Sequence, residues 1–268
     1  ELLQLVQHVT NDIAHDLRTP LTRHRARLEQ AKRECEQPLV HELAHELTHE
    51  GAHAPMPASM QTSMQAMCEQ AVQEVDQILS TFNALLSIAQ IEGALLSAQP
   101  VLLTQLCTDA IEVYEPIVTQ HNRSLQVQIA EDVWVLGQRD LLFQAIANLL
   151  DNAAQYAPMG AHIGLILSID SVQQQVVLQV ANSGSTIAPH DRDRVFQRLV
   201  RLDVSRRTST HQGNGLGLAL VRAITKAHQG KVSVVDANAQ MRAWLSVAST
   251  DEVCVFECRL QAINIPLL

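Results

Sequence analysis

The stretch HQGNGLGLALV, residues 211–221, places three glycines directly before an apolar helical pattern. Gly213, Gly215 and Gly217 leave the backbone N–H groups uncovered where the helix begins. The first turn of a helix has free N–H groups and a partial positive charge, so this stretch can hold phosphate groups. A glycine-rich helix start also occurs where two elements simply pack closely, so support must come from the rest of the chain.

A second stretch upstream, NLLDNAAQY at residues 148–156, is predicted to lie on a helix. Asn148 and Asn152 are four residues apart, so their carboxamides project from the same helix face. Carboxamide oxygens in this arrangement can bind Mg²⁺ or phosphate-bound water. Two asparagines on a solvated helix face are the ordinary alternative.

Between these two lies VANSGSTI, residues 180–187, where an apolar strand runs into a tight turn. Gly184 can let the backbone approach a ligand there, and Asn182 can contact the edge of a base. Alone, this stretch is an ordinary turn.

Periodicity around the three stretches predicts a mixed α+β domain over residues 94–268, with helices on one face of a mostly antiparallel sheet. Helices are expected at 102–120, 140–156 and 216–228. Strands are expected at 124–129, 133–136, 162–170, 175–181, 231–236, 243–248 and 253–260.

The N-terminal part, residues 1–93, has a different pattern. Apolar residues recur at threes, fours and sevens from Leu2 to Leu47, which predicts one long helix bent near Pro20. Gly and Pro residues at 51–57 end it, and a second helix is expected at 58–92. Two such helices form an antiparallel hairpin, whose uncovered apolar faces predict a homodimer with a four-helix bundle.

The first helix carries NDIAHDLRTPL, residues 11–21. His15 stands beside Asp16, and such a pair can expose an imidazole nucleophile with a carboxylate to hold or take its ring proton. A histidine on an amphipathic helix is more often merely solvated or packed.

Taken together, these stretches resemble the H, N, G1 and G2 boxes of the sensor histidine kinases of bacterial two-component systems. VFQRLVRLDVSRR, residues 195–207, resembles the F box and the start of the ATP lid. The resemblance implies a dimerisation and phosphotransfer hairpin, followed by an α/β sandwich of the type shared by histidine kinases, Hsp90 and gyrase.

The same resemblance implies an activity. ATP would phosphorylate His15 while Asp16 accepts or orients its proton, and the phosphoryl group would pass to an aspartate of a response-regulator receiver domain. Thr19 matches the position that orients water for dephosphorylating the regulator, although a helical Thr often bonds only its own backbone.

For ATP and Mg²⁺, the resemblance implies that Asn148 and Asn152 hold the metal and the phosphates. Tyr156 would line the pocket, and Asn182 would take the adenine amino group. The other implied nucleotide-binding residues are Gly184, Arg198, Arg201, Arg206, Gly213, Gly215, Gly217 and Leu218. The arginines could equally belong to a solvated loop.

Five positions depart from the family pattern. Asn182 replaces Asp, Gln155 replaces Lys and Thr186 replaces Gly. Leu199 stands where a second F-box Phe is common, and Gln229 stands where the first Gly of an HGG turn is usual. Weakened nucleotide affinity is therefore expected. Two other classes of protein stay open: a gyrase- or Hsp90-type ATPase that forms no phosphohistidine, and a catalytically weak signalling scaffold.

A row of histidines at 41, 45, 49 and 53, in HELAHELTHEGAH, contains overlapping HExxH strings, which suit Zn²⁺. A metalloprotease is rejected, because a two-helix hairpin offers neither a third ligand nor a substrate cleft. A metal-responsive or pH-responsive row and a plain solvated stripe remain open.

Composition excludes several classes. A net charge of −9 disfavours nucleic acid as a partner, and the five scattered cysteines disfavour a disulfide framework. No apolar run is long enough for a membrane span. The chain begins at Glu1 with helical periodicity and no preceding helix cap, so it is expected to be part of a longer protein. The resemblance implies that the full-length protein is anchored in the bacterial inner membrane and that this fragment is cytoplasmic.

Overall fold

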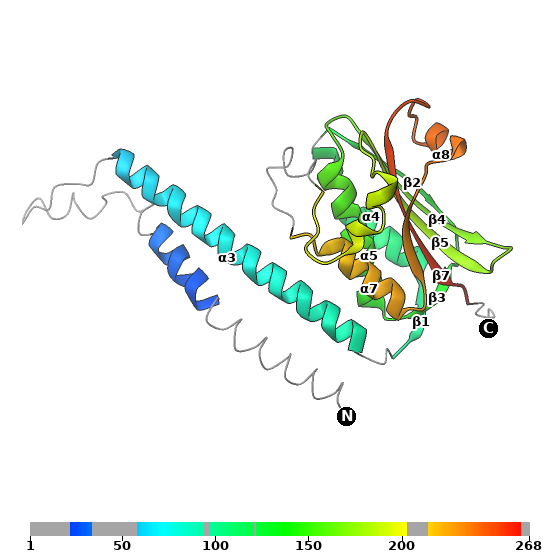
Figure 1. Ribbon diagram of the computed structural model, residues 1–268, viewed down its shortest axis with the longest axis horizontal. Helices are drawn as coiled ribbons and strands as arrows, with labels where there is room; N and C mark the ends of the chain where they lie inside the picture. Colours follow the sequence, from blue (N-terminus) through cyan, green and yellow to red (C-terminus); the bar gives the residue numbers. More distant parts are fainter. Residues whose placement is uncertain (1–21, 34–57, 94–96, 121, 203–213, 264–268) are drawn as a thin grey trace, which may run out of the picture. The chain divides into compact units, whose positions relative to one another are not determined.

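The computed structural model describes residues 22–33, 58–93, 97–120, 122–202 and 214–263 of the 268-residue chain (Figure 1). The chain divides into two compact units, Glu1–Leu86 and Ser87–Leu268. The predicted domains 1–93 and 94–268 remain a prediction.

In the first unit, residues 22–33 form a helix that packs along α3 (Ala58–Gly93). Arg25 Nε lies 2.8 Å from Asp76 Oδ1, and Lys32 Nζ lies 2.9 Å from Glu69 Oε1. Residue numbers rise along one helix as they fall along the other, so the two run antiparallel, as predicted for the hairpin. Each exposed ion pair contributes only about 0 to 1 kcal/mol, so they report the register more than they stabilise it.

The second unit is built on a five-stranded sheet with the strand order β2-β4-β5-β7-β6. Strands β2 and β4 are parallel, and the other neighbouring pairs are antiparallel. A separate antiparallel pair joins β1 to β3. The strands are β1 (Gln99–Leu102), β2 (Ser124–Ile129), β3 (Trp134–Gly137), β4 (His162–Asp170), β5 (Gln175–Ser183), β6 (Lys231–Val235) and β7 (Val253–Gln261).

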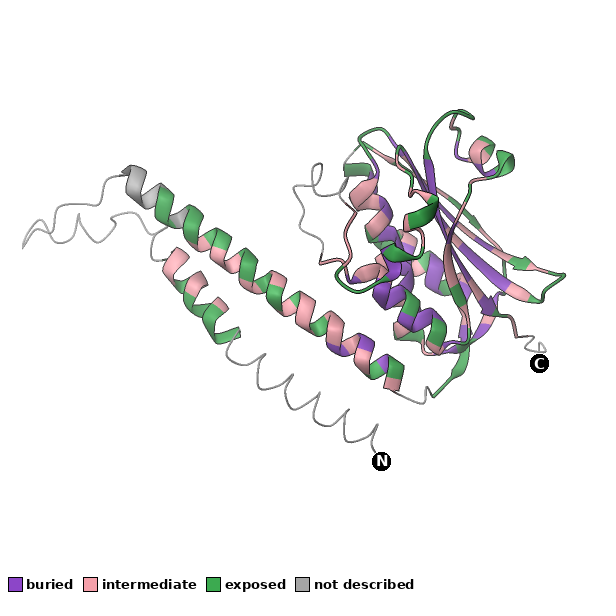
Figure 2. Ribbon diagram, in the orientation of Figure 1, coloured by how far each residue is buried: buried purple, intermediate pink, exposed green. Residues whose placement is uncertain are grey.

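Three helices cover one face of this sheet: α4 (Leu103–Gln120), α5 (Arg139–Tyr156) and α7 (Gly217–Ala227) (Figure 1). Buried residues gather between these helices and the strands (Figure 2). On β4 the fully buried Ile163, Leu165 and Leu167 alternate with other residues, because successive side chains of a strand point to opposite faces. Two short 3₁₀ turns, Pro189–Asp191 and Arg194–Phe196, lead from β5 toward α7.

The predicted strand at 243–248 is wrong. Residues Ala239–Trp244 form a short helix, α8, which lies on the other side of the sheet from α4, α5 and α7 (Figure 1). The Asn238 side chain accepts the Met241 N–H at 2.8 Å, which caps the helix and contributes about 1 kcal/mol. Met241 and Leu245, one helical turn apart, are buried in a cluster with residues of β5 and β7.

The other predicted helices and strands of the second unit are confirmed to within two residues. Strand β1 was not predicted. None of the helices in the described ranges is both long enough and apolar enough to cross a lipid bilayer.

Candidate functional site

Helix α5 orients the side chain of Asn148. Its Nδ2 donates to the Gln144 carbonyl at 2.7 Å, which leaves Oδ1 as its ligand-facing atom. A Cβ atom added to Gly217 would stand 3.1 Å from this Oδ1. The side-chain oxygen of Asn148 and the first residue of α7 are therefore brought together, although they are far apart in the sequence.

The start of α7 is suited to an anion. Leu216 precedes the helix and provides no side-chain cap, so the first N–H groups have no such partner. Gly217 adds no side chain between these groups and Asn148. A phosphate group fits this position because of the helix dipole and the free N–H donors.

Gly215 holds the segment before α7 against the F-box residues. It has a φ of +65°, and a Cβ atom there would stand 2.9 Å from the Val200 carbonyl oxygen. The Leu199 N–H donates to the Gly215 carbonyl at 2.9 Å. The two chain segments that flank residues 203–213 therefore lie side by side.

Arg201 lies beside this contact, with its Cγ 3.3 Å from the position of a Gly215 Cβ. Its Nε is buried and makes no hydrogen bond within the described part of the chain. A buried guanidinium nitrogen without a partner is costly, and an anionic ligand near Gly215 would satisfy it.

Arg198 has a different environment. Its Nη2 lies 2.5 Å from Glu92 Oε2, and about half of each side chain is exposed. The structure therefore places this predicted phosphate ligand in an ion pair with the last turn of α3.

Asn182 lies at the end of β5 and is only 1% exposed. Its Nδ2 donates to Ser185 Oγ at 2.7 Å and lies 3.5 Å from the Ser183 carbonyl oxygen. Since a carbonyl can only accept, this contact fixes the amide nitrogen on that side and leaves Oδ1 to accept from a ligand.

Gly184 shapes the turn after Asn182. Its φ is +83°, and a Cβ atom there would stand 2.4 Å from Pro158 Cγ. Both the conformation and the space therefore require glycine.

Sequence reasoning missed one partner of α5. Asp151, inside the NLLDNAAQY stretch, accepts a hydrogen bond from Tyr114 of α4. Loss of solvent raises the pKa of Asp151, an effect that the Tyr114 bond partly offsets; burial and the Asp151 bond also raise the pKa of Tyr114. The pair ties α4 to α5, and no spacing in the sequence links residues 37 positions apart.

The remaining predicted residues divide into two groups. Asn152, Tyr156 and Leu218 are partly buried on α5 and α7. Those outside the described residues are His15, Asp16, Thr19, Arg206, Gly213 and the histidine row 41–53.

Within the described ranges, no three His, Cys, Asp or Glu side chains gather into a metal site, which leaves the two asparagines of α5 as candidates for Mg²⁺.

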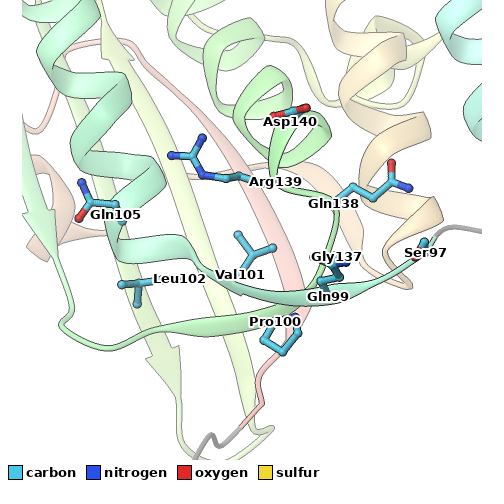
Figure 3. Close-up of a pocket in the computed structure, with 10 residues that line it drawn as sticks. All are labelled: Ser97, Gln99, Pro100, Val101, Leu102, Gln105, Gly137, Gln138, Arg139 and Asp140. Carbon is cyan, nitrogen blue, oxygen red and sulfur yellow. The ribbon is translucent and has the colours of Figure 1, made fainter.

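An open hollow of about 570 Å³ lies at the other end of α5 (Figure 3). Residues of β1, including Pro100 and Val101, line it together with Gly137, Gln138 and Asp140. Asn148 is nine residues beyond Arg139, which is about 13 Å along the helix. This hollow is therefore separate from the residues suited to phosphate.

A family model described as "Histidine kinase-, DNA gyrase B-, and HSP90-like ATPase" matches residues 137–261. The histidine protein kinase SaeS of Staphylococcus aureus is 27% identical over 165 residues, which cover 61% of this chain and 47% of SaeS. The chain spans about half the length of the curated relatives it matches.

Two solved structures are similar to this chain. Full-length ShkA in complex with AMPPNP matches with a TM-score of 0.65 and 23% identity, over 97% of this chain and 47% of ShkA. The mycobacterial sensor histidine kinase MprB matches with a TM-score of 0.51 and 25% identity, over 63% of this chain and 99% of the MprB chain. The similarity to ShkA shows only that the two chains share a fold.

Proposed function

We propose, because this chain belongs to the sensor histidine kinases, that it transfers the γ-phosphoryl group of ATP to His15. The observation that carries the proposal is the meeting of Asn148 Oδ1 with the uncapped start of α7 at Gly217. The family's sequence boxes predict both residues in contact with the nucleotide.

In the proposed reaction, a ring nitrogen of His15 forms a bond to the γ-phosphorus as the bond to the bridging oxygen breaks and ADP leaves. Asp16 accepts or orients the ring proton. The phosphates lie against the N–H groups of α7, with Arg201 beside them. Rate enhancement comes mostly from in-line positioning and charge neutralisation.

Asn148 and Asn152 would hold Mg²⁺, because their carboxamide oxygens are hard ligands on one helix face. The ion supplies positive charge to the phosphates when bound. The residues present fit this role, since Asn148 has its nitrogen engaged by the helix and its oxygen directed toward α7.

The phosphoryl group then passes from His15 to an aspartate of a response-regulator receiver domain. Thr19, one helical turn after His15, would orient the water that dephosphorylates the regulator. Mixing the labelled protein with candidate receiver domains would measure both reactions.

The protein forms a homodimer through the helical hairpin. Met67 and Ile78 of α3 are 69% and 51% exposed in the single chain, and a second hairpin would cover such side chains in a four-helix bundle. Sedimentation equilibrium would detect the dimer.

Membrane anchoring of the full-length protein, implied by the family, is also proposed, and fractionation of cells would test it.

Incubation with γ-labelled ATP and Mg²⁺ tests the central proposal. The chain is expected to take up label that is stable to alkali and lost in acid, because a phosphoramidate bond to histidine has this stability. Phosphate release without protein label would favour a gyrase-type ATPase. Failure to bind a fluorescent ATP analogue would favour a scaffold.

Asn182 provides a test of base recognition. Asn182→Ala is expected to weaken ATP binding about tenfold, because the adenine amino group loses its acceptor. Binding of ITP, which lacks this amino group, should change less, so the preference for ATP over ITP should shrink. Competition against a fluorescent ATP analogue measures both.

The control for Asn182 is Asn238→Ala, which removes the cap of α8 and leaves the turn at Asn182 intact. It is expected to retain the ATP preference. An unchanged preference in Asn182→Ala would remove Asn182 from the adenine site.

A further inference from the structure

His228 follows the last residue of α7 and is 8% exposed. Its Nε2 lies 3.0 Å from the backbone nitrogen of Gln138, and its Nδ1 lies 2.8 Å from the Ile224 carbonyl oxygen. A backbone N–H can only donate and a carbonyl can only accept. The two partners therefore define a neutral ring with its proton on Nδ1.

The ring is packed tightly against the turn that begins α5. A Cβ atom on Gly137 would stand 2.4 Å from His228 Cδ2 and 2.7 Å from Nε2. Glycine at 137 is thus required by the imidazole, and Gln138 immediately after it supplies the N–H that the ring accepts.

Helices α5 and α7 consequently meet at two places. His228 joins the end of α7 to the start of α5, and Gly217 at the start of α7 meets Asn148 further along α5. The separations nearly match: eleven residues on α7 and ten on α5 correspond to about 16 Å and 15 Å. A shift at the His228 end would therefore slide Gly217 past Asn148.

We propose that His228 is a positioning residue for the nucleotide site. By holding the end of α7 on Gln138, it sets the register in which the N–H groups at the start of α7 face Asn148 Oδ1. This role rests on the proposed function, since that register matters for phosphate. The His228 ring itself does not touch the nucleotide.

His228→Phe keeps a ring of similar size and removes both hydrogen bonds. ATP affinity is expected to fall about tenfold, because a small displacement of positioned groups has large effects. His228→Gln can still offer an acceptor to Gln138, and is expected to recover affinity to within about twofold of wild type. Titration with a fluorescent ATP analogue measures this series.

Met241→Ala is the matched control for lost stability. It opens a cavity in the cluster under α8, on the other side of the sheet, and destabilises the domain without touching α5 or α7. Wild-type ATP affinity is expected in this variant. Equal losses in Met241→Ala and His228→Phe would overturn the positioning role.

A second measurement needs no nucleotide. In ¹H–¹⁵N NMR spectra of the free protein, His228→Phe is expected to shift the Gly217 N–H and Asn148 side-chain signals, and His228→Gln to shift them less. Unmoved signals would overturn the proposal even if the protein binds ATP. If the signals move but the wild-type protein binds no ATP, the positioning role of His228 would be supported and the proposed kinase function would be contradicted.

Acid provides another readout of the same contact. Burial lowers the pKa of His228 below its usual 6.5, an effect that the Ile224 bond partly offsets. Between pH 6.5 and this lowered pKa, the unfolded chain binds a proton that the folded chain does not. The unfolding equilibrium constant should therefore rise by up to about tenfold per pH unit below 6.5.

The acid effect should be missing from His228→Phe. Urea unfolding at several pH values, compared between wild type and this variant, measures the difference. An identical pH dependence in the two proteins would contradict a buried neutral ring at position 228.

Discussion

The His15→Ala variant is expected to bind ATP within about twofold of wild type and to incorporate no acid-labile phosphate. The reason is chemical, because alanine has no nucleophile, and the residues proposed to bind the nucleotide lie in the other compact unit. Labelling with γ-labelled ATP and titration with a fluorescent analogue give the two quantities.

The control is His24→Ala, which removes an exposed imidazole from the helix over residues 22–33. This variant should label as wild type does. Residual acid-labile label in His15→Ala would mean that another histidine accepts the phosphoryl group, and the histidines at 41–53 would be examined next.

Gly217→Val is expected to lower ATP affinity about tenfold to a hundredfold. The added Cβ would stand 3.1 Å from Asn148 Oδ1, and the branched carbons beyond it would displace that oxygen or cover the first N–H groups of α7. Gly217→Ala, which adds only the Cβ, should show a smaller loss. Equilibrium titration with the ATP analogue measures the series.

Valine is also β-branched, and its side chain has few allowed rotamers in a helix. Arg222→Val controls for this effect because Arg222 lies exposed on the same helix. Wild-type affinity is expected in Arg222→Val. If Gly217→Val also binds normally, the phosphates do not lie at the start of α7.

Local pattern was sufficient for most of the second unit. On β4 and α5 the apolar period and the element length agree, so both elements appear where the sequence predicts them. Residues 243–248 were ambiguous, because a short run with apolar residues two positions apart fits a strand, while Met241 and Leu245 fit one helix face. Leu245 is buried within the cluster that includes residues of β5 and β7, and Asn238 caps the helix, so the helix is favoured over the strand.

Some residues of the candidate site could be predicted from the sequence, and others could not. Asn148, Asn182 and the glycines near α7 belong to local motifs and could be found by spacing. His228 with Gly137 could not, because the two residues are 91 positions apart and only the folded chain brings them together. The Arg198 pair with Glu92 also depends on a distant partner.

The parallel pairing of β2 with β4 has a consequence for folding kinetics. Ser124 pairs with His162, 38 residues later, and the chain between them contains all of α5. Closing such a loop costs conformational entropy before the stabilising contacts between the strands can form, so parallel strand pairs form slowly. Asn148 lies on the helix that connects these two strands, so we expect its final position against the sheet to depend on the slow pairing of β2 with β4.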